Sequence, residues 1–499
     1  MKPLGTITKY YPFIDEESKS TLNSLLEKSS SYFDFVQRLC ESVIANEAPV
    51  NLAYIAAVQA WWCRLDKAMV GIREKYNDSR RIKSWGFAHA SFEIDQARYH
   101  DSVVEAIEQM MSNSPEDWIL TELHLLHAHY HWPMFGDIPS LLEPVEKGRK
   151  LIAANPLLEC FEAQACFYEG WAKRVEGDIK EAIAIYQKGI ELAQAYDEFL
   201  HLYLNLGGKG DAQKNVNIQD ALASFDASYV VAQDLGVPYL EAEVLHDTAL
   251  VFETAGEYDL AISSLLEAWK TYGLDNGTSF PLLQLSRVYA RLGDGQQALE
   301  TVQSYMDSIG HQETIGGYLV RALALAQLDR VAEAESDLIK VYPLVMQRGL
   351  DRILGRYYLA SGLVEQARGD YLAASDFLEK GLEIFEQVGD VHGEKSRALL
   401  GLARAEIVLV KKATNGEKSI TPGTWLCRAE KHAVDRNLPG IRMEVAFLMS
   451  EFYQSHGQIK DAIGTLEGAL DITDSLGVRT LRTRISERIA ELRSLPKEI

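Results

Sequence analysis

The sequence predicts an all-α protein in which antiparallel helix pairs stack one on another. A phrase of fixed spacing recurs six times along the 499 residues, and such a period is the signature of a helical-repeat array. No segment between turn signals alternates apolar and polar residues as a half-buried strand would. The 14 prolines fall mostly in predicted turns, as an all-helical chain requires. These three observations together indicate helix pairs and no sheet.

Each copy of the phrase has a small residue, a Gly or Asp seven positions later, an Ala five positions after that and a large apolar residue four positions further on. The small residue lets a partner helix approach, the Gly or Asp ends the first helix, and the Ala lies where the second helix crosses the first. One pair cannot bury its apolar face alone, so several must stack. The copies are Gly170, Gly177, Ala182, Tyr186; Ala249, Gly256, Ala261, Leu265; Ser286, Gly293, Ala298, Val302; Ala322, Asp329, Ala334, Leu338; Gly362, Gly369, Ala374, Leu378; and Ser450, Gly457, Ala462, Leu466.

The composition is that of a folded, acidic chain. Hydrophobic residues make up 47% and charged residues 24%, and the formal net charge is −22. Phosphate backbones and anionic membrane surfaces would repel that charge, so we expect no direct nucleic-acid or membrane partner. The five cysteines form no C-x-x-C pair, the first residues lack the apolar core of a signal peptide, and no stretch is apolar enough to span a membrane. We therefore expect a cytoplasmic protein.

The phrase divides the chain into three parts. Residues 1–78 lack it and are expected to form an N-terminal helical cap or divergent repeats, with three helices, the last running through Leu52 and Met69. Residues 79–476 are expected to hold about ten helix pairs. The glycines at 207, 208 and 210 suggest a small insertion in the pair 197–236. Residues 477–499 are expected to be a polar C-terminal capping helix, and residues 412–423 a projecting, trypsin-sensitive loop in the penultimate pair.

The phrase resembles the tetratricopeptide repeat (TPR), and its best copy runs from Tyr168 to Gly189. Most alanines at the crossing position are 36 to 40 residues apart, longer than the 34 residues of the short form. That longer style is similar to the repeats of MalT-type bacterial regulators and Rap-type peptide receptors. The resemblance implies a right-handed superhelix, a solenoid with a concave inner groove.

In the TPR family, certain positions of the first helix of each pair line this groove. The set carried over is mostly apolar, and three arginines stand in it as isolated positive points, which suits an extended or helical peptide with some acidic side chains. The alternative is that these residues pack against one another inside a tight superhelix. The predicted partner-binding residues are Phe167, Trp171, Arg174, His246, Leu250, Leu283, Arg287, Arg291, Leu319, Leu323, Leu359, Leu363, Phe447 and Glu451, and the same rule also selects Glu253.

A histidine cluster is the one candidate metal site in the sequence. On a helix, His124, His127 and His131 would share a face, and three imidazoles could bind zinc or sense pH. No Cys lies close in sequence, and a further ligand would have to come from another helix. The alternative is ordinary packing, because His127 and His131 occupy the positions of Tyr168 and Ala172 in the next copy. We expect no metal and no cofactor.

No catalytic motif stands out in the sequence. Residues 393–396 and 416–419 end like a phosphate-binding loop, but both lack its first glycine and follow no predicted strand. We therefore expect a non-enzymatic scaffold that binds a protein or peptide segment in the groove. The alternative hypothesis is a regulatory receiver that senses a small ligand or short peptide and acts on a separate effector protein.

Overall fold

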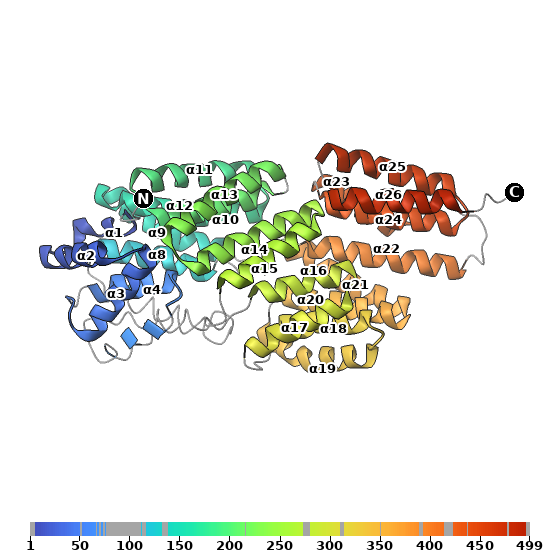
Figure 1. Cartoon of the computed structure of the whole chain (residues 1–499), viewed down its shortest axis with the longest axis horizontal. Helices are drawn as coiled ribbons and strands as arrows, with labels where there is room; N and C mark the ends of the chain where they lie inside the picture. The colour runs from blue at the N-terminus through green and yellow to red at the C-terminus, as the bar shows by residue number, and fades with distance from the viewer. Residues whose placement is uncertain are drawn as a thin grey trace. The chain divides into compact units, whose positions relative to one another are not determined.

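The computed structural model describes a chain made of helices, and among its described residues there is no strand (Figure 1). The described residues are 5–49, 52–65, 116–131, 138–214, 216–272, 280–309, 314–349, 351–388, 393–413, 423–436, 438–476 and 479–495, with 67, 68, 71, 72, 75 and 111. Most consecutive helices pack against one another. The predicted fold class, an all-α solenoid of stacked antiparallel helix pairs, is confirmed.

The chain divides into two compact units, which we describe separately. Unit 1 holds residues 1–213 and 219–244, and unit 2 holds residues 214–218 and 245–499. In unit 1 the helices are α1 (Gly5–Thr8), η1 (Tyr11–Phe13), α2 (Glu16–Lys28), α3 (Tyr32–Ala45), α4 (Leu52–Trp62), α8 (Asp117–His131), α9 (Ile138–Ala154), η2 (Pro156–Phe161), α10 (Glu162–Glu176), α11 (Ile179–Ala195), α12 (Phe199–Gln213) and α13 (Ile218–Leu235).

Unit 2 contains most copies of the phrase. Helix α14 (Pro238–Ala255) crosses the division between the units, and its residues from Leu245 onward belong to unit 2. The other helices of unit 2 are α15 (Tyr258–Tyr272), α16 (Phe280–Leu292), α17 (Gly295–Ser308), α18 (Ile315–Gln327), α19 (Val331–Arg348), α20 (Asp351–Arg368), α21 (Tyr371–Val388), α22 (Glu394–Ala413), α23 (Thr424–Asp435), α24 (Pro439–Ser455), α25 (Ile459–Leu476) and α26 (Arg479–Ser494).

The contacts within each pair explain the spacing of the phrase. A Cβ added to Gly170 would lie 2.8 Å from the ring of Tyr186, and one added to Gly362 would lie 2.6 Å from Leu378. The small and large positions therefore touch, as predicted. All six turn positions have positive φ, including the non-glycine Asp329 at 59°. The crossing alanines are fully buried at all six positions, which accounts for their small size.

The predicted insertion at residues 207–210 is wrong. Helix α12 continues through all three glycines. A Cβ on Gly208 would lie 2.4 Å from the ring of Tyr186, and one on Gly210 would lie 2.9 Å from the ring of Phe225. Here the glycines admit aromatic side chains of neighbouring helices instead of marking a loop.

The first helices of successive pairs form a continuous layer. Helix α10 contacts α8 and α12 in unit 1, and α16, α18, α20, α22 and α24 contact one another in succession in unit 2. The second helices make no contact of comparable extent with each other among the described residues. Because the first helices lie closer together, they line the inside of the curve in each unit. We call the surface of these first helices the inner face.

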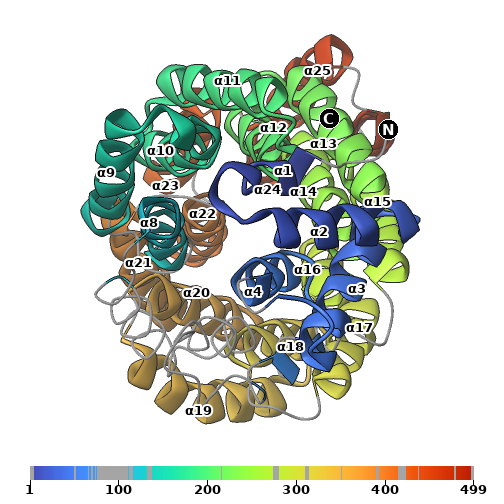
Figure 2. The same ribbon diagram turned by 90° about the vertical axis from the view of Figure 1, so that its left-hand side faces the viewer.

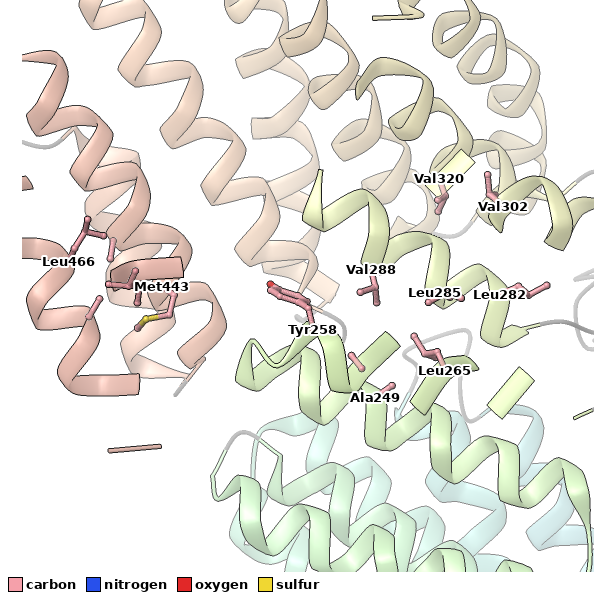
Figure 3. Close-up of a cluster of buried hydrophobic side chains, with 14 of the residues drawn as sticks. Ala249, Tyr258, Leu265, Leu282, Leu285, Val288, Val302, Val320, Met443 and Leu466 are labelled. Atoms are coloured by element: carbon pink, nitrogen blue, oxygen red, sulfur yellow. The ribbon is translucent and has the colours of Figure 1, made fainter. Parts of the chain in front are cut away.

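The apolar core of unit 2 joins helices far apart in sequence. Figure 3 shows Leu285 and Val288 of α16 near Leu265 and Tyr258 of α15, in a cluster that also includes Met443. The Tyr258 hydroxyl donates a hydrogen bond to Glu444 Oε1 at 3.2 Å. The end of α14 and the start of α24 also meet, since a Cβ on Gly440 would lie 3.1 Å from the Thr254 carbonyl oxygen.

Other expectations fall partly outside the described residues. The third predicted helix, α4, ends at Trp62, and Met69 is not described. Nearly all of the predicted pair 79–112 and residues 414–422 of the predicted loop also lie outside, and helix α26 falls within 477–499. The domain boundaries at 78 and 476 stay a prediction. None of the described helices combines the length and apolar character that crossing a membrane requires.

Candidate functional site

In unit 1 the N-terminal segment (residues 5–49 and 52–65) lies against the first helices. Helix α1 contacts α12 (Figure 2). The Tyr10 hydroxyl donates to Glu122 Oε1 of α8 at 2.7 Å, and the Gln59 amide of α4 donates to Tyr10. The Arg64 guanidinium lies 4.8 Å from the ring centroid of Tyr239 in α14. The chain's own N-terminus therefore covers inner-face positions of unit 1.

A buried ion cluster fastens this segment. The Lys9 ammonium lies 3.3 Å from Glu198 and 3.5 Å from Glu122, and the side chains of Lys9 and Glu198 are 2% and 0% exposed. Burial alone would lower the pKa of Lys9, but the two carboxylates outweigh it and raise that pKa. Burial alone would raise the pKa of Glu198, but His201 and Lys9 hold it at about 2. Each charge depends on its partners, because an isolated buried ion is strongly destabilising.

An aromatic cage beside the ion cluster encloses His129. Its ring lies 4.8 Å from that of Trp61 and 5.7 Å from that of Trp62, and its Nδ1 lies 3.3 Å from the Tyr168 hydroxyl. Burial, with a smaller effect from Arg64, lowers the pKa of His129 to about 3. This neutral histidine therefore packs between the N-terminal segment and the repeats, and the sequence analysis did not single it out.

The predicted binding residues of unit 1 are packed or paired. Phe167 is only 4% exposed, and its ring lies 6.3 Å from that of Tyr186. Trp171 is partly buried. The Arg174 guanidinium forms an ion pair with Asp211 of α12 at 3.0 Å. Phe167 and Arg174 are thus packed or paired within the unit, and that any of the three residues binds a partner stays a prediction.

The predicted positions of unit 2 retain more exposure. Leucines from four successive first helices are partly exposed on the inner face, as are His246 and Phe447, and Glu451 is exposed. Leu319 and Leu359 are buried in the core of the unit. The partly exposed leucines are Leu250, Leu283, Leu323 and Leu363. That this surface binds a partner stays a prediction.

An arginine-rich cluster crosses the same inner face. In its first part, Arg291 of α16 pairs with Glu253 of α14, whose side chain is only 4% exposed. In its second part, Arg356 of α20 donates to Glu394 of α22 at 2.6 and 2.9 Å, and Arg352 lies 3.7 Å from the same carboxylate. The two carboxylates thus already have arginine partners.

Arg287 lies between these two groups without a carboxylate partner among the described residues. Its Nη1 donates to Gln284 Oε1 at 3.2 Å. Burial, with the like charges of Arg356 and Arg291, lowers the pKa of Arg287 to about 10. The surroundings of Arg287 thus stabilise its charged form less than water does, as expected at a binding site for an anion.

The predicted histidine cluster lies only partly within the described residues. Within the part of the chain that the structure describes, no group of three or more His, Cys, Asp or Glu side chains could hold a metal ion. His124 and His127 are partly buried on α8, and the side chain of His131 lies outside the described residues. Three residues that complete the arginine cluster were not predicted from the sequence: Gln284, Arg356 and Glu394.

Comparison with known proteins finds similarity only among solved structures. No protein-family model and no curated protein sequence matches the chain. A Rap protein complexed with Competence and Sporulation Factor matches with a TM-score of 0.39 and 12% identity, over 75% of this chain and 97% of that one. The apo form of the quorum sensor NprR from B. thuringiensis matches with a TM-score of 0.46 and 16% identity, over 72% and 99%.

A tetratricopeptide repeat protein from Parabacteroides merdae matches with a TM-score of 0.34 and 17% identity, over 58% of this chain and 96% of the other. The expected resemblance to TPR proteins and Rap-type receptors is confirmed at the level of architecture. The resemblance to MalT-type regulators stays a prediction. Similarity at these TM-scores says nothing about what this chain binds.

Proposed function

We propose that this chain is a non-enzymatic scaffold that binds a peptide or protein segment on the inner face of unit 2. One observation carries the proposal. The first helices α14, α16, α18 and α20 each present a partly exposed leucine there, beside an arginine that lacks a carboxylate partner among the described residues. In unit 1, by contrast, the N-terminal segment occupies inner-face positions.

A row of apolar side chains one repeat apart suits a long, narrow ligand. Burying these leucines under a ligand makes the binding free energy more favourable by about 25 cal/mol per Å² of apolar surface removed from water. A peptide can place a side chain against each repeat in turn, as helical-repeat proteins use their extended inner surfaces. A nucleic-acid ligand is disfavoured by the net charge of −22. A location in the cytoplasm remains part of the proposal.

The test is selection from a random dodecapeptide display library against the full chain. Selected peptides should bind the double variant Leu323→Ala/Leu363→Ala at least tenfold more weakly than the native chain. The matched control is Leu266→Ala/Leu372→Ala. Both leucines lie on second helices, and they are 42% and 71% exposed, respectively. The control should bind like the native chain. Circular dichroism confirms that each variant is folded.

Two results would overturn the proposal. One is that no peptide is enriched above a bare-resin background. The other is that the folded variant Leu323→Ala/Leu363→Ala binds every selected peptide as tightly as the native chain. Either result would remove the inner face of unit 2 as the binding surface.

The regulatory receiver remains the second candidate function. Arg287 favours it, because a guanidinium with no carboxylate partner in the described part of the chain can hold a small anionic ligand. Thermal-shift measurements with a metabolite panel and a peptide panel separate the two. A rise of several degrees with one small molecule, and none with peptides, would favour the receiver.

A further inference from the structure

We propose that Arg287 anchors a carboxylate-binding site on the inner face of unit 2, which receives an acidic side chain or the free C-terminal carboxylate of a bound peptide. The inference rests on the proposed function and adds the chemistry of one position to it. It assigns the site to this arginine and not to the other cations of the same cluster.

No carboxylate among the described residues forms an ion pair with Arg287, and Glu394 offsets only part of its charge from a longer distance. Gln284 is held in place because its amide nitrogen donates to Glu253 Oε1 at 2.7 Å. Its amide oxygen is then turned to accept from Arg287. An amide oxygen is neutral, so this hydrogen bond orients the guanidinium without balancing its charge. The other oxygen of Glu253 accepts from Arg291.

The second nearby carboxylate is already shared. Glu394 accepts two hydrogen bonds from Arg356 and lies close to Arg352. The cluster thus has four guanidinium groups, those of Arg287, Arg291, Arg352 and Arg356, and two carboxylates, those of Glu253 and Glu394. Among the described residues, these two carboxylates pair with Arg291, Arg352 and Arg356, and neither forms an ion pair with Arg287. A cation without an ion-pair partner in a chain of net charge −22 would favour acidic ligands at this place.

A glycine opens the space in which the guanidinium lies. A Cβ on Gly316 would lie 3.0 Å from Leu283 Cδ2 and 3.5 Å from Arg287 Nη2. Arg287 therefore rests against bare backbone in the first turn of α18. The start of a helix carries partial positive charge, which repels a guanidinium and attracts an anion. A carboxylate here would meet Arg287 and this helix end together.

A carboxylate is the anion that fits the described geometry best. A guanidinium presents parallel N–H groups that a planar carboxylate can accept in pairs. Leu283 stands beside Arg287 on α16 and is partly exposed. The site thus combines one charged contact with apolar surface, as an acidic residue flanked by apolar residues in a peptide requires.

The test uses defined probes on the full chain at constant ionic strength. Three pentapeptides are compared by calorimetry and thermal shift: Ac-Gly-Leu-Glu-Leu-Gly-NH2, Ac-Gly-Leu-Gln-Leu-Gly-OH and the neutral Ac-Gly-Leu-Gln-Leu-Gly-NH2. Inorganic phosphate is the fourth probe. At least one carboxylate-bearing peptide should bind roughly tenfold more tightly than the neutral one, and which of them does so identifies the source of the carboxylate.

Two variants decide whether Arg287 is responsible. Arg287→Met keeps the length of the side chain and should abolish the preference for the charged peptides. Arg330→Met removes an exposed arginine that pairs with Glu333 on α19, and it should leave the preference unchanged. The inference is overturned if Arg287→Met keeps the preference or the neutral peptide binds equally well. It is also overturned if phosphate binds more tightly than both carboxylates, or if no probe binds.

The two proposals can fail separately. Dodecapeptides selected without any enrichment in acidic residues or dependence on a free C-terminus would leave the scaffold standing and overturn the carboxylate site. The opposite outcome is also possible: the pentapeptides bind at Arg287 in a carboxylate-dependent way, while Leu323→Ala/Leu363→Ala does not weaken binding of the selected dodecapeptides. That outcome would overturn the scaffold proposal and leave the carboxylate site standing.

Discussion

Removing the charge of Arg287 should stabilise unit 2. Folding lowers the pKa of this arginine from its ordinary value to about 10, chiefly through burial and then through Arg356 and Arg291. At pH 7 the group is charged in both the folded and the unfolded chain, so the full unfavourable difference applies. A shift of that size corresponds to about 3 kcal/mol at about 1.4 kcal/mol per pKa unit, and relaxation of the surroundings reduces it. We expect Arg287→Met to raise the free energy of unfolding by about 1–2 kcal/mol.

Arg291→Met provides the opposite case on the same helix. Its loss leaves the Glu253 carboxylate, which is almost fully buried, without its cation. Breaking such a pair from one side typically destabilises a protein by about 3 kcal/mol. The two substitutions remove the same charge from the same inner face, four residues apart. Their effects on stability should therefore have opposite signs.

Urea unfolding monitored by hydrogen exchange of α16 and α18 measures both effects locally. This readout is needed because the chain has two units, which need not unfold in one step. The reasoning is refuted if Arg287→Met lowers the free energy of unfolding by more than about 1 kcal/mol, the size of a typical destabilising substitution. Equal effects of the two substitutions would refute it too.

Three further predictions concern the repeats and the N-terminal segment. Gly362→Ala should destabilise unit 2 by about 1–3 kcal/mol in urea unfolding because its Cβ would collide with Leu378, whereas Gly464→Ala, with open space around it, should stabilise by about 0.5–1 kcal/mol. Asp329→Gly should stabilise by about 0.5–1 kcal/mol because it relieves a left-handed backbone, and an unchanged urea midpoint would contradict this. The folded-state pKa of His129 lies below its unfolded value of 6.5. Its contribution to the free energy of unfolding is therefore fully present above pH 6.5 and is lost as the pH falls toward about 3, by at most about 1.4 kcal/mol per pH unit. His129→Gln should flatten this part of a pH titration of unfolding, and an unchanged slope between pH 6 and 4 would count against it.

The repeat phrase predicted the fold because it records contacts that recur in every pair. The approach of Gly170 to Tyr186 and the left-handed turn at Gly177 are local to one pair, and their spacing is fixed by helix geometry. The glycines of α12 were misinterpreted for a related reason. A glycine that admits an aromatic ring from another helix has the same sequence appearance as one that makes a turn.

The inner face was less predictable because its state depends on other parts of the chain. The sequence treated Arg174, Arg287 and Arg291 as three similar cations. In the structure Arg174 pairs with Asp211 and Arg291 pairs with Glu253. Arg287 forms no ion pair with a carboxylate among the described residues. Likewise, no pattern within the repeats indicates that the N-terminal segment covers inner-face positions of unit 1.

The ion pairs of the inner face nevertheless follow a rule that the sequence contains. Arg291 pairs with Glu253 and Arg356 with Glu394, each 38 residues away, and Arg174 pairs with Asp211, 37 residues away. That distance is about one repeat, so the partner lies at the matching place on an adjacent first helix. For Arg287 the residues 37 and 38 positions away on either side are leucines and alanines, namely Leu250, Ala249, Ala324 and Leu325.

The same rule allows Arg287 to be given an internal partner. Leu250 and Arg287 lie on α14 and α16, as do Glu253 and Arg291, and Leu250 is partly exposed. We expect Leu250→Glu to pair with Arg287 and to abolish the preference for carboxylate peptides while the arginine stays in place. A double-mutant cycle with Arg287→Met should give a favourable coupling free energy of about 1–3 kcal/mol in urea unfolding. Leu323→Glu, one repeat further along the inner face at a distance of 36 residues from Arg287, is the control, and it should show weaker coupling. Two results would contradict this explanation: a coupling free energy near zero for Leu250→Glu, or a preference for carboxylate peptides that persists in the Leu250→Glu variant. Either would show that the absence of an acidic residue one repeat away does not explain why Arg287 has no ion-pair partner.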